Sequence, residues 1–200
     1  MKEIATRTRD IARELARKYS TMTHEELDTL ESILVPMKFT KGEMILKEGE
    51  VCKNIYYVEK GLIRQFYTKN GKELTEHLGD DHSIFMCIES LFKEEPTHLQ
   101  VEALEPTWVF ALPKKHLEEE AIHNTNIQML YRKILEESLI QSQIHADLVR
   151  FETAQNRYKK LCKLDPQVVL RAPLVYIANY LQMTPETLSR VRASSLQDED

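Results

Sequence analysis

The sequence predicts an α+β protein in which a glycine-punctuated β-roll lies between helical segments and a helix-turn-helix follows at the C-terminal end. Three observations predict this. All five glycines fall between Gly42 and Gly79, in a segment rich in β-branched and aromatic residues. Residues 126–151 contain no glycine or proline, which is typical of one long helix. Residues 174–192, LVYIANYLQMTPETLSRVR, have the pattern of two short helices joined by a tight turn.

Charge is distributed unevenly along the chain. The 200 residues are 42% hydrophobic, which suits one large or two small domains with a packed core, and the net charge is −5. Residues 150–192 nevertheless hold eight basic and three acidic side chains, whereas residues 1–149 carry a net −7. An acidic body with a basic C-terminal segment indicates that any contact with nucleic acid is local.

Several classes of protein are disfavoured by what the sequence lacks. Cys52, Cys87 and Cys162 are far apart and form no CxxC pair, so we predict no metal site of the zinc-knuckle or iron–sulfur type. No apolar run approaches the ~18 residues that span a membrane. The N-terminus is charged throughout and lacks the apolar region of a signal peptide. We therefore expect a cytoplasmic protein with reduced thiols and no membrane partner.

The N-terminal half is predicted element by element. Residues 3–19 form a helical pattern, and the Thr23–Glu26 capping box starts a second helix. Asn70-Gly71 is a strong signal for a type I′ hairpin. Many short strands separated by glycines indicate a roll or barrel. The strand candidates are residues 44–46, 55–58, 62–67, 101–103 and 108–112.

The long helix carries apolar residues at a spacing close to a heptad, which predicts a seam between two copies of the chain. The seam residues are Ile127, Leu130, Ile134, Ile144 and Leu148. An alternative is that this face packs on the roll. A second apolar face, expected to cover the roll, holds Met129, Leu135, Leu139 and Val149. Glu137 and Gln141 lie in the middle of the predicted seam, where a polar group fixes register or meets a ligand.

The C-terminal segment has clear helix signals. Residues 153–164 read as a helix that ends at Asp165-Pro166. In the helix-turn-helix, Thr184 suits the N-cap and Pro185 the first helical position. Gln182 stands where such turns often have glycine, so the turn requires left-handed backbone at some cost. The acidic residues 197–200 are expected to be disordered.

The second of these helices supplies candidate DNA contacts. Arg190 matches guanine O6 and N7, and Glu186 matches the amino group of cytosine. An alternative is that these two side chains form only a surface pair four residues apart. Phosphate is the expected contact of Arg171, Thr187 and Arg192. The predicted DNA-binding residues are Arg171, Thr184, Pro185, Glu186, Thr187, Ser189, Arg190 and Arg192.

This order of parts resembles the Crp/Fnr superfamily over about residues 24–193. The matching segments are KGEMILKEG at 41–49, IYYVEKGLIR at 55–64 and TPETLSR at 184–190. The resemblance implies a cyclic-nucleotide-binding-like sensor domain and a homodimer on a palindromic operator. It also implies base contacts at the positions of Pro185, Glu186 and Arg190. Proline replaces a usual contacting side chain, so a different target sequence is expected.

Cyclic-nucleotide-binding members of that family hold phosphate with a Gly-Glu start and an arginine end. The equivalent residues 85–100 contain neither glycine nor arginine, and no arginine occurs between Arg64 and Arg132. Burying a phosphodiester without a cation costs several kcal/mol, so we expect no cyclic AMP binding of the usual kind. An unknown small-molecule effector is left open, with a pocket formed by Cys87, Glu89, Thr97, His98, Glu137 and Gln141.

No cofactor is predicted. Haem is the weaker alternative, and its candidate ligands are His77, His82, His98, Cys52 and Cys87. The sequence has no Walker loop, GxSxG or HExxH motif, so we do not expect an enzyme.

The leading interpretation is a homodimeric, sequence-specific transcription regulator that binds double-stranded DNA, with RNA polymerase left open as a partner. Its expected parts are a sensor domain at 1–125, a dimerisation helix at 126–151 and a DNA-binding domain at 152–200. The alternative is an effector-binding or protein-interaction module with a degenerate helix-turn-helix. The acidic overall charge favours it, as does the short stretch after Arg192, which leaves no room for the wing expected from the family.

Overall fold

The computed structural model describes residues 2–197, so the end of the predicted disordered tail, residues 198–200, lies outside the described residues. The chain begins with two helices, α1 (Lys2–Tyr19) and α2 (His24–Ile33). The Thr23 hydroxyl accepts from the Glu26 N–H at 3.3 Å, and the Glu26 carboxylate accepts from the Thr23 N–H at 2.7 Å. The predicted capping box is therefore confirmed.

In the part of the chain that the structure describes, eight strands form a roll of two four-stranded antiparallel sheets, with strand orders β1-β8-β3-β6 and β2-β7-β4-β5. The five strand candidates are confirmed, and β1, β5 and β6 are added to them; β5 is the second strand of the predicted hairpin. Asn70 and Gly71 have φ of 52° and 73°, as a type I′ turn requires between paired Lys69 and Lys72. The strands are β1 (Val35–Phe39), β2 (Met44–Leu46), β3 (Asn54–Lys60), β4 (Ile63–Lys69), β5 (Lys72–Gly79), β6 (Ile84–Phe85), β7 (Gln100–Ala103) and β8 (Thr107–Pro113).

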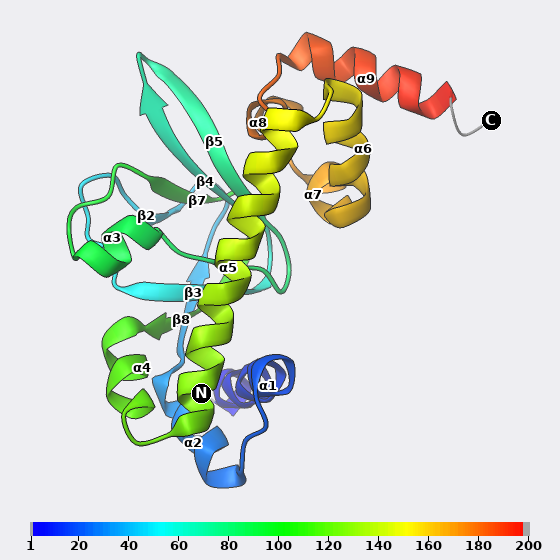
Figure 1. The fold of residues 1–200 in the computed structure, drawn as a ribbon. Helices are drawn as coiled ribbons and strands as arrows, with labels where there is room; N and C mark the ends of the chain where they lie inside the picture. Colours follow the sequence, from blue (N-terminus) through cyan, green and yellow to red (C-terminus); the bar gives the residue numbers. More distant parts are fainter. Residues whose placement is uncertain (1, 198–200) are drawn as a thin grey trace.

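Three short helices lack a counterpart in the prediction. α3 (Ile88–Lys93), α4 (Lys114–Ala121) and α7 (Pro166–Arg171) have six, eight and six residues. Such lengths give too few turns for a clear helical period. α3 packs at the edge of the roll, and α4 follows its last strand (Figure 1).

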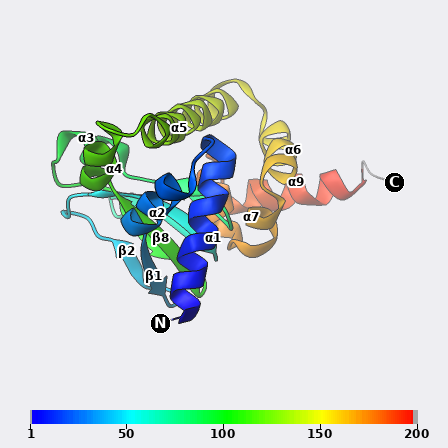
Figure 2. The same ribbon diagram turned by 90° about the horizontal axis from the view of Figure 1, so that it is seen from below.

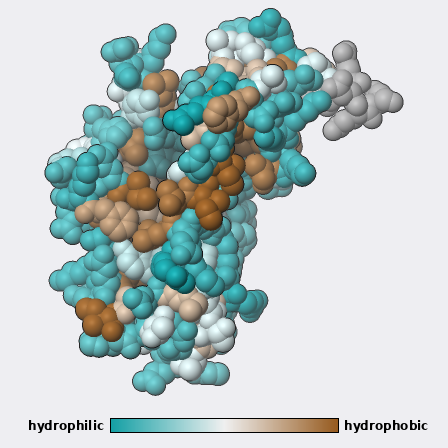
Figure 3. Space-filling view, in the orientation of Figure 1, coloured by the Kyte–Doolittle hydropathy of each residue, from teal (hydrophilic) through white to brown (hydrophobic). Residues whose placement is uncertain are grey.

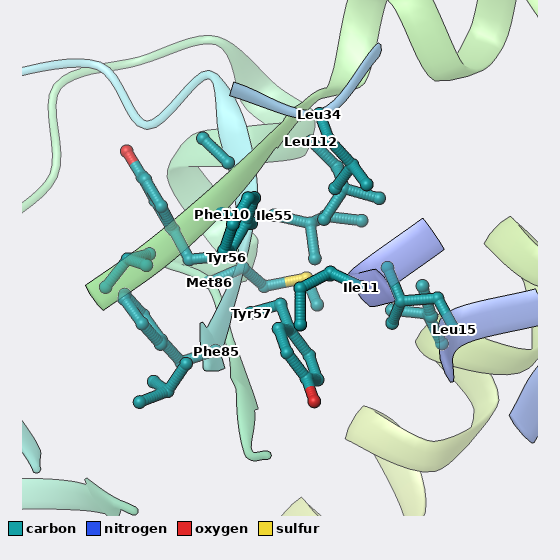
Figure 4. Close-up of a cluster of buried hydrophobic side chains, with 14 of the residues drawn as sticks. Ile11, Leu15, Leu34, Ile55, Tyr56, Tyr57, Phe85, Met86, Phe110 and Leu112 are labelled. Atoms are coloured by element: carbon teal, nitrogen blue, oxygen red, sulfur yellow. The ribbon is translucent and has the colours of Figure 1, made fainter. Parts of the chain in front are cut away.

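The main core joins the roll to the N-terminal helices. Ile11 and Leu15 of α1 face Ile55 and Tyr57 of β3 in the close-up of Figure 4. All four side chains are buried. The cluster continues into the first half of the long helix, so α1, α2 and α4 gather at one end of the roll around that helix (Figures 1 and 2).

The predicted long helix is confirmed as α5 (Thr125–Phe151). The side chain of Asn124 caps it by accepting from the N–H groups of Asn126 and Ile127. α5 runs along one side of the roll, from the N-terminal helices to the C-terminal lobe (Figures 1 and 2).

The C-terminal lobe is a small helical unit with its own core. It consists of α6 (Ala154–Leu164), α7 (Pro166–Arg171), α8 (Leu174–Tyr180) and α9 (Pro185–Gln197). Leu161, Ile177 and Leu188 form its centre, and Leu62 and Leu78 of the roll belong to the same buried cluster. The lobe is therefore packed against the roll as well as joined to it through α5. None of the described helices is both long and apolar enough to cross a membrane.

Candidate DNA interface and sensor cleft

The second helix of the helix-turn-helix, α9, presents the predicted face to the outside. The hydroxyl of Thr184 accepts from the Thr187 N–H at 3.2 Å, which places Thr184 at the N-cap and Pro185 at the first position. Leu188 points inward and is fully buried. Thr187 is half-buried. The remaining predicted contacts of this helix are exposed: Pro185, Glu186, Ser189, Arg190 and Arg192.

The turn before α9 has the strained geometry that the sequence analysis predicts. Gln182 has φ of 52°, in the left-handed region. Arg157 of α6 holds this turn, since its guanidinium donates to the carbonyl of Leu181 at 2.9 Å and to that of Gln182 at 3.3 Å. Arg157 has no recognisable signal in the sequence, because its partners lie 24 and 25 residues away. These bonds offset the conformational cost of a non-glycine residue at the turn.

The exposed face of α9 offers both a hydrogen-bond acceptor, Glu186, and a cationic donor, Arg190. A hydrogen bond from its own backbone N–H, then one from Thr184, and then the nearby Arg190 lower the pKa of Glu186. Glu186 is therefore a carboxylate that accepts hydrogen bonds. The Arg190 guanidinium donates to the Thr187 hydroxyl at 3.4 Å, a weak contact that leaves it available to another partner.

Arg171 lies elsewhere. Its guanidinium donates to the carbonyl of Gly61 at 2.7 Å and to the carboxylates of Asp81 and Glu105. The hydrogen bond to Glu105 is the main reason that the pKa of Arg171 is raised. In this conformation Arg171 fastens the C-terminal lobe to the roll and is not directed at the face formed by α9.

A second contact between the roll and the lobe involves Arg64. This side chain is 1% exposed, and its guanidinium lies 4.1 Å from the ring centre of Phe66 and 3.8 Å from that of Tyr176 in α8. It also pairs with Glu73 at 2.7 Å and Glu102 at 3.1 Å. A buried cation between two rings and two carboxylates holds α8 against β5.

A cleft of about 1450 Å³ separates the roll from α5 and the helix-turn-helix. Its lining includes all the predicted effector residues. Glu137 is held there by the Lys18 ammonium and the Tyr19 hydroxyl. Of the described residues that line the cleft, seven are acidic and two, Lys18 and Arg150, are lysine or arginine. The six predicted effector residues thus lie around one cleft: Cys87, Glu89, Thr97, His98, Glu137 and Gln141.

Two histidines of the cleft, His77 and His145, are far apart in the sequence and form a pair that no local pattern predicts. Within the described part of the chain, His77 Nε2 and His145 Nδ1 are buried without a hydrogen-bond partner. Burial, and then the charge of His145, lower the pKa of His77 to about 4. Burial also lowers the pKa of His145, which stacks on Tyr180 of α8 with ring centres 4.3 Å apart. These neutral imidazoles lie where the roll, α5 and the C-terminal lobe meet.

The haem alternative can be placed on the structure. His77, His82 and His98 all line the cleft, but His82 is hydrogen-bonded to the Tyr57 hydroxyl at 2.6 Å. The described residues contain no group of three or more histidine, cysteine or acidic side chains placed to hold a metal ion.

The predicted seam on α5 needs correction. Ile127, Leu130, Ile134 and Leu148 are buried inside the protomer, the first three in the main core and the last in the core of the C-terminal lobe. They are unavailable to a second copy, and Ile144, at 43% exposed, is the seam residue that remains. Leu139, expected on the roll, is instead 68% exposed. The exposed apolar stripe of α5 is Leu139, Ile140, Ile144 and Phe151.

Comparison with known proteins agrees with this architecture. Residues 36–124 match the family model of the cyclic nucleotide-binding domain. No curated protein sequence matches the chain. The structure of FixK2 from Bradyrhizobium japonicum is 21% identical, with a TM-score of 0.71 over 84% of this chain and 86% of that one.

Two further structures share the fold. The catabolite activator protein of Thermus thermophilus is 21% identical, with a TM-score of 0.53 over 90% of this chain and 86% of that one. A regulator of the crp/fnr family from Eubacterium rectale is 14% identical, with a TM-score of 0.64 over 88% and 85%. Residues 36–124 therefore resemble the cyclic nucleotide-binding domain, and the chain has the fold seen in structures of Crp/Fnr regulators.

Proposed function

We propose that this chain is a homodimeric, sequence-specific transcription regulator that reads DNA with α9. The observation that carries the proposal is the exposed polar face of α9, on a capped helix whose preceding turn is fixed by Arg157. Glu186, Ser189 and Arg190 on that face present acceptors and donors that match base edges in the major groove. A protein that reads chromosomal DNA in this way acts in the cytoplasm.

The exposed stripe of α5 is the proposed dimer contact. Figure 3 shows apolar atoms gathered over the middle of α5. Pairing two copies of this helix places one DNA-binding unit on each side of a two-fold axis. Two α9 helices then reach successive major grooves about 34 Å apart, so the operator is expected to be palindromic. In this arrangement residues 1–125 form the sensor, 126–151 the dimerisation helix and 152–200 the DNA-binding domain.

The cleft is the proposed effector site. Its acidic lining disfavours a phosphodiester, because an anion brought beside carboxylates loses hydration without gaining cationic partners. A ligand there touches both the roll and α5, so its binding would shift α5 and pass the movement through the hinge near Phe151 to the DNA-binding lobe. Titration calorimetry with cyclic AMP should show no binding, and micromolar affinity would refute this part of the proposal.

The DNA contact is tested by selecting bound fragments from a genomic library and measuring affinity for the best one. Arg190→Ala should weaken binding by about 1–3 kcal/mol, or roughly 5–150-fold, and relax the preference at one base position in each half-site. Lys115→Ala is the matched control. This lysine is 82% exposed on α4 and its substitution removes the same charge, so affinity should be unchanged.

Two results would argue against the proposal. Undiminished and equally selective binding by Arg190→Ala would show that α9 does not read bases. Failure of the unaltered protein to select any palindrome would favour the alternative, a module whose helix-turn-helix no longer grips DNA.

A further inference from the structure

Arg171, the last residue of α7, is engaged by the roll through all three of its guanidinium nitrogens. Nη1 and Nη2 each donate to an oxygen of Asp81 at 3.3 Å. Nε donates to one oxygen of Glu105 at 3.3 Å, and Nη2 donates to the other. Nη2 also donates to the carbonyl of Gly61 at 2.7 Å. We call Arg171, Gly61, Asp81 and Glu105 the Arg171 cluster. Within it, each nitrogen of the guanidinium already contacts a carboxylate.

The Arg171 cluster lies at the start of the helix-turn-helix. Arg171 stands three residues before Leu174, where α8, the first helix of the motif, begins. In a helix-turn-helix bound to DNA, the first helix crosses the sugar–phosphate backbone, so a cation at this position can bind phosphate. Here two carboxylates of the roll hold that cation. They repel phosphate and compete with it for the same guanidinium.

Other contacts keep the lobe in this position. Leu62 and Leu78 of the roll are 1% and 5% exposed and share a buried cluster with Ile177 of α8. The Asn179 side chain of α8 donates to the carbonyl of Glu73 in β5 at 3.4 Å. The lobe is therefore held to the roll along α7 and α8, whereas α9 points away from the roll (Figures 1 and 2).

Asp81 connects the Arg171 cluster to the cleft. Its carboxylate holds Arg171, and the residue also lines the cleft between its neighbours Asp80 and His82. A charged group that binds in the cleft beside Asp81 changes the attraction between this carboxylate and Arg171. Occupation of the cleft can therefore act on the contact between the roll and the lobe directly, in addition to any movement of α5.

We propose that the Arg171 cluster is an autoinhibitory contact, in which Asp81 and Glu105 of the roll withhold Arg171 from DNA. This inference rests on the proposed function. With the contact made, the lobe meets DNA through α9 but without Arg171. When the contact is released, Arg171 exchanges the two carboxylates for a phosphate. DNA and the carboxylates compete for one side chain, so whatever weakens the contact strengthens DNA binding by the same factor.

The test replaces both carboxylates by amides, in the full chain with Asp81→Asn and Glu105→Gln. Each substitution keeps the size of the side chain and an oxygen acceptor, so the Gly61 N–H, which donates to Asp81 at 2.6 Å, keeps its partner. Affinity for the selected palindrome should rise at least about 5-fold. The salt dependence should also steepen, by about 2 in the slope of log K against log salt concentration, because each protomer of the dimer gains one phosphate contact.

Two controls separate this effect from a general loss of negative charge. Glu119→Gln with Glu120→Gln removes the same two charges from the exposed surface of α4, and affinity and salt slope should be unchanged. Adding Arg171→Gln to the Asp81→Asn, Glu105→Gln protein should abolish the gain in both. A gain of equal size in the α4 control, or one that persists without Arg171, would overturn the proposal.

Hydrogen exchange of the free protein reports the release itself. Backbone amides of residues 166–180 should exchange faster in the Asp81→Asn, Glu105→Gln protein than in the unaltered one, and equal protection would contradict a release of the lobe. Should this protein fail to fold, Glu105→Gln alone gives the same test, since it removes one carboxylate and leaves the partner of the Gly61 N–H in place.

The outcomes distinguish this inference from the proposed function. An unaltered protein that selects a palindrome, with amide variants that bind it no more tightly, would refute the autoinhibitory contact and leave the DNA-binding function standing. Unaltered and variant proteins that all select no DNA would refute both.

Discussion

The exposed stripe of α5 gives a quantitative prediction for dimerisation. Its four side chains, Leu139, Ile140, Ile144 and Phe151, are 68%, 56%, 43% and 77% exposed. Complete burial of such a side chain contributes about 1.5–3 kcal/mol, so the exposed parts of eight side chains in a symmetric dimer offer roughly 10 kcal/mol. This gain must offset about 4–15 kcal/mol for the translational and rotational freedom that two protomers lose on association. The two terms are similar in size, so the loss of one apolar contact should change the dimer Kd measurably.

Replacing Ile140 with aspartate should separate the protomers. Each dimer loses about 2 kcal/mol of apolar burial and acquires two carboxylates that resist desolvation. A total loss of at least about 3 kcal/mol raises the dimer Kd by more than 100-fold. Sedimentation velocity over a range of concentrations measures this change. Ile122→Asp is the matched control, because Ile122 is 74% exposed at the end of α4 and lies outside the stripe. An Ile140→Asp protein as dimeric as the parent would refute the assignment of the interface.

Two further predictions concern stability. The native pKa of His77 is about 4. In the unfolded chain the pKa of this histidine is about 6.5, so between pH 4 and 6.5 the imidazole is protonated only in the unfolded state. The free energy of unfolding therefore falls by about 2 kcal/mol from pH 7.5 to 5. Urea unfolding at both pH values should show a smaller loss for His77→Gln, and an equal loss would contradict the burial argument. Gly61 has a φ of 131°, and a Cβ added to it would lie 2.3 Å from Thr107 Oγ1. Gly61→Ala should therefore cost more than about 3 kcal/mol. Gly71→Ala, with open space around it, should cost about 1–2 kcal/mol. Similar melting temperatures for the two alanine variants would contradict this reasoning.

Local signals in the sequence were sufficient for much of the fold. The Thr23 capping box, the Asn70-Gly71 turn and the Thr184 cap each depend on residues close in sequence, and each is present in the structure. The left-handed turn at Gln182 was also foreseen, because helix-turn-helix geometry requires it. Such features are predictable since their partners lie within a few positions along the chain.

The face of α5 that would meet a second copy was not predictable in the same way. Apolar residues occur nearly all round this helix, so the spacing alone gives two solutions. The roll selects the face of Ile127, Leu130 and Ile134, because that face completes its core. The surface that covers this face of α5 is formed by residues of the roll that are far away in the sequence. The spacing of apolar residues within α5 carries no information about that surface.

The same reason explains what sequence reasoning missed in the site. Arg171 was expected to bind phosphate from its charge, but its partners Asp81 and Glu105 lie 90 and 66 residues away. His77 and His145 meet only after the roll, α5 and the C-terminal lobe have packed. The six effector candidates line one cleft because four of them lie in the short segment 85–100 and the other two, Glu137 and Gln141, are one turn apart on α5.

The central claim is that two α9 helices, fixed by one dimer, read two half-sites together. The most direct measurement is the affinity for the selected palindrome before and after inserting about 5 base pairs, half a helical turn, between its halves. The insertion rotates one half-site to the opposite side of the duplex, so affinity should fall to that of a single half-site. Equal affinity for both duplexes would show that the two helices do not bind as a fixed pair and would contradict the account.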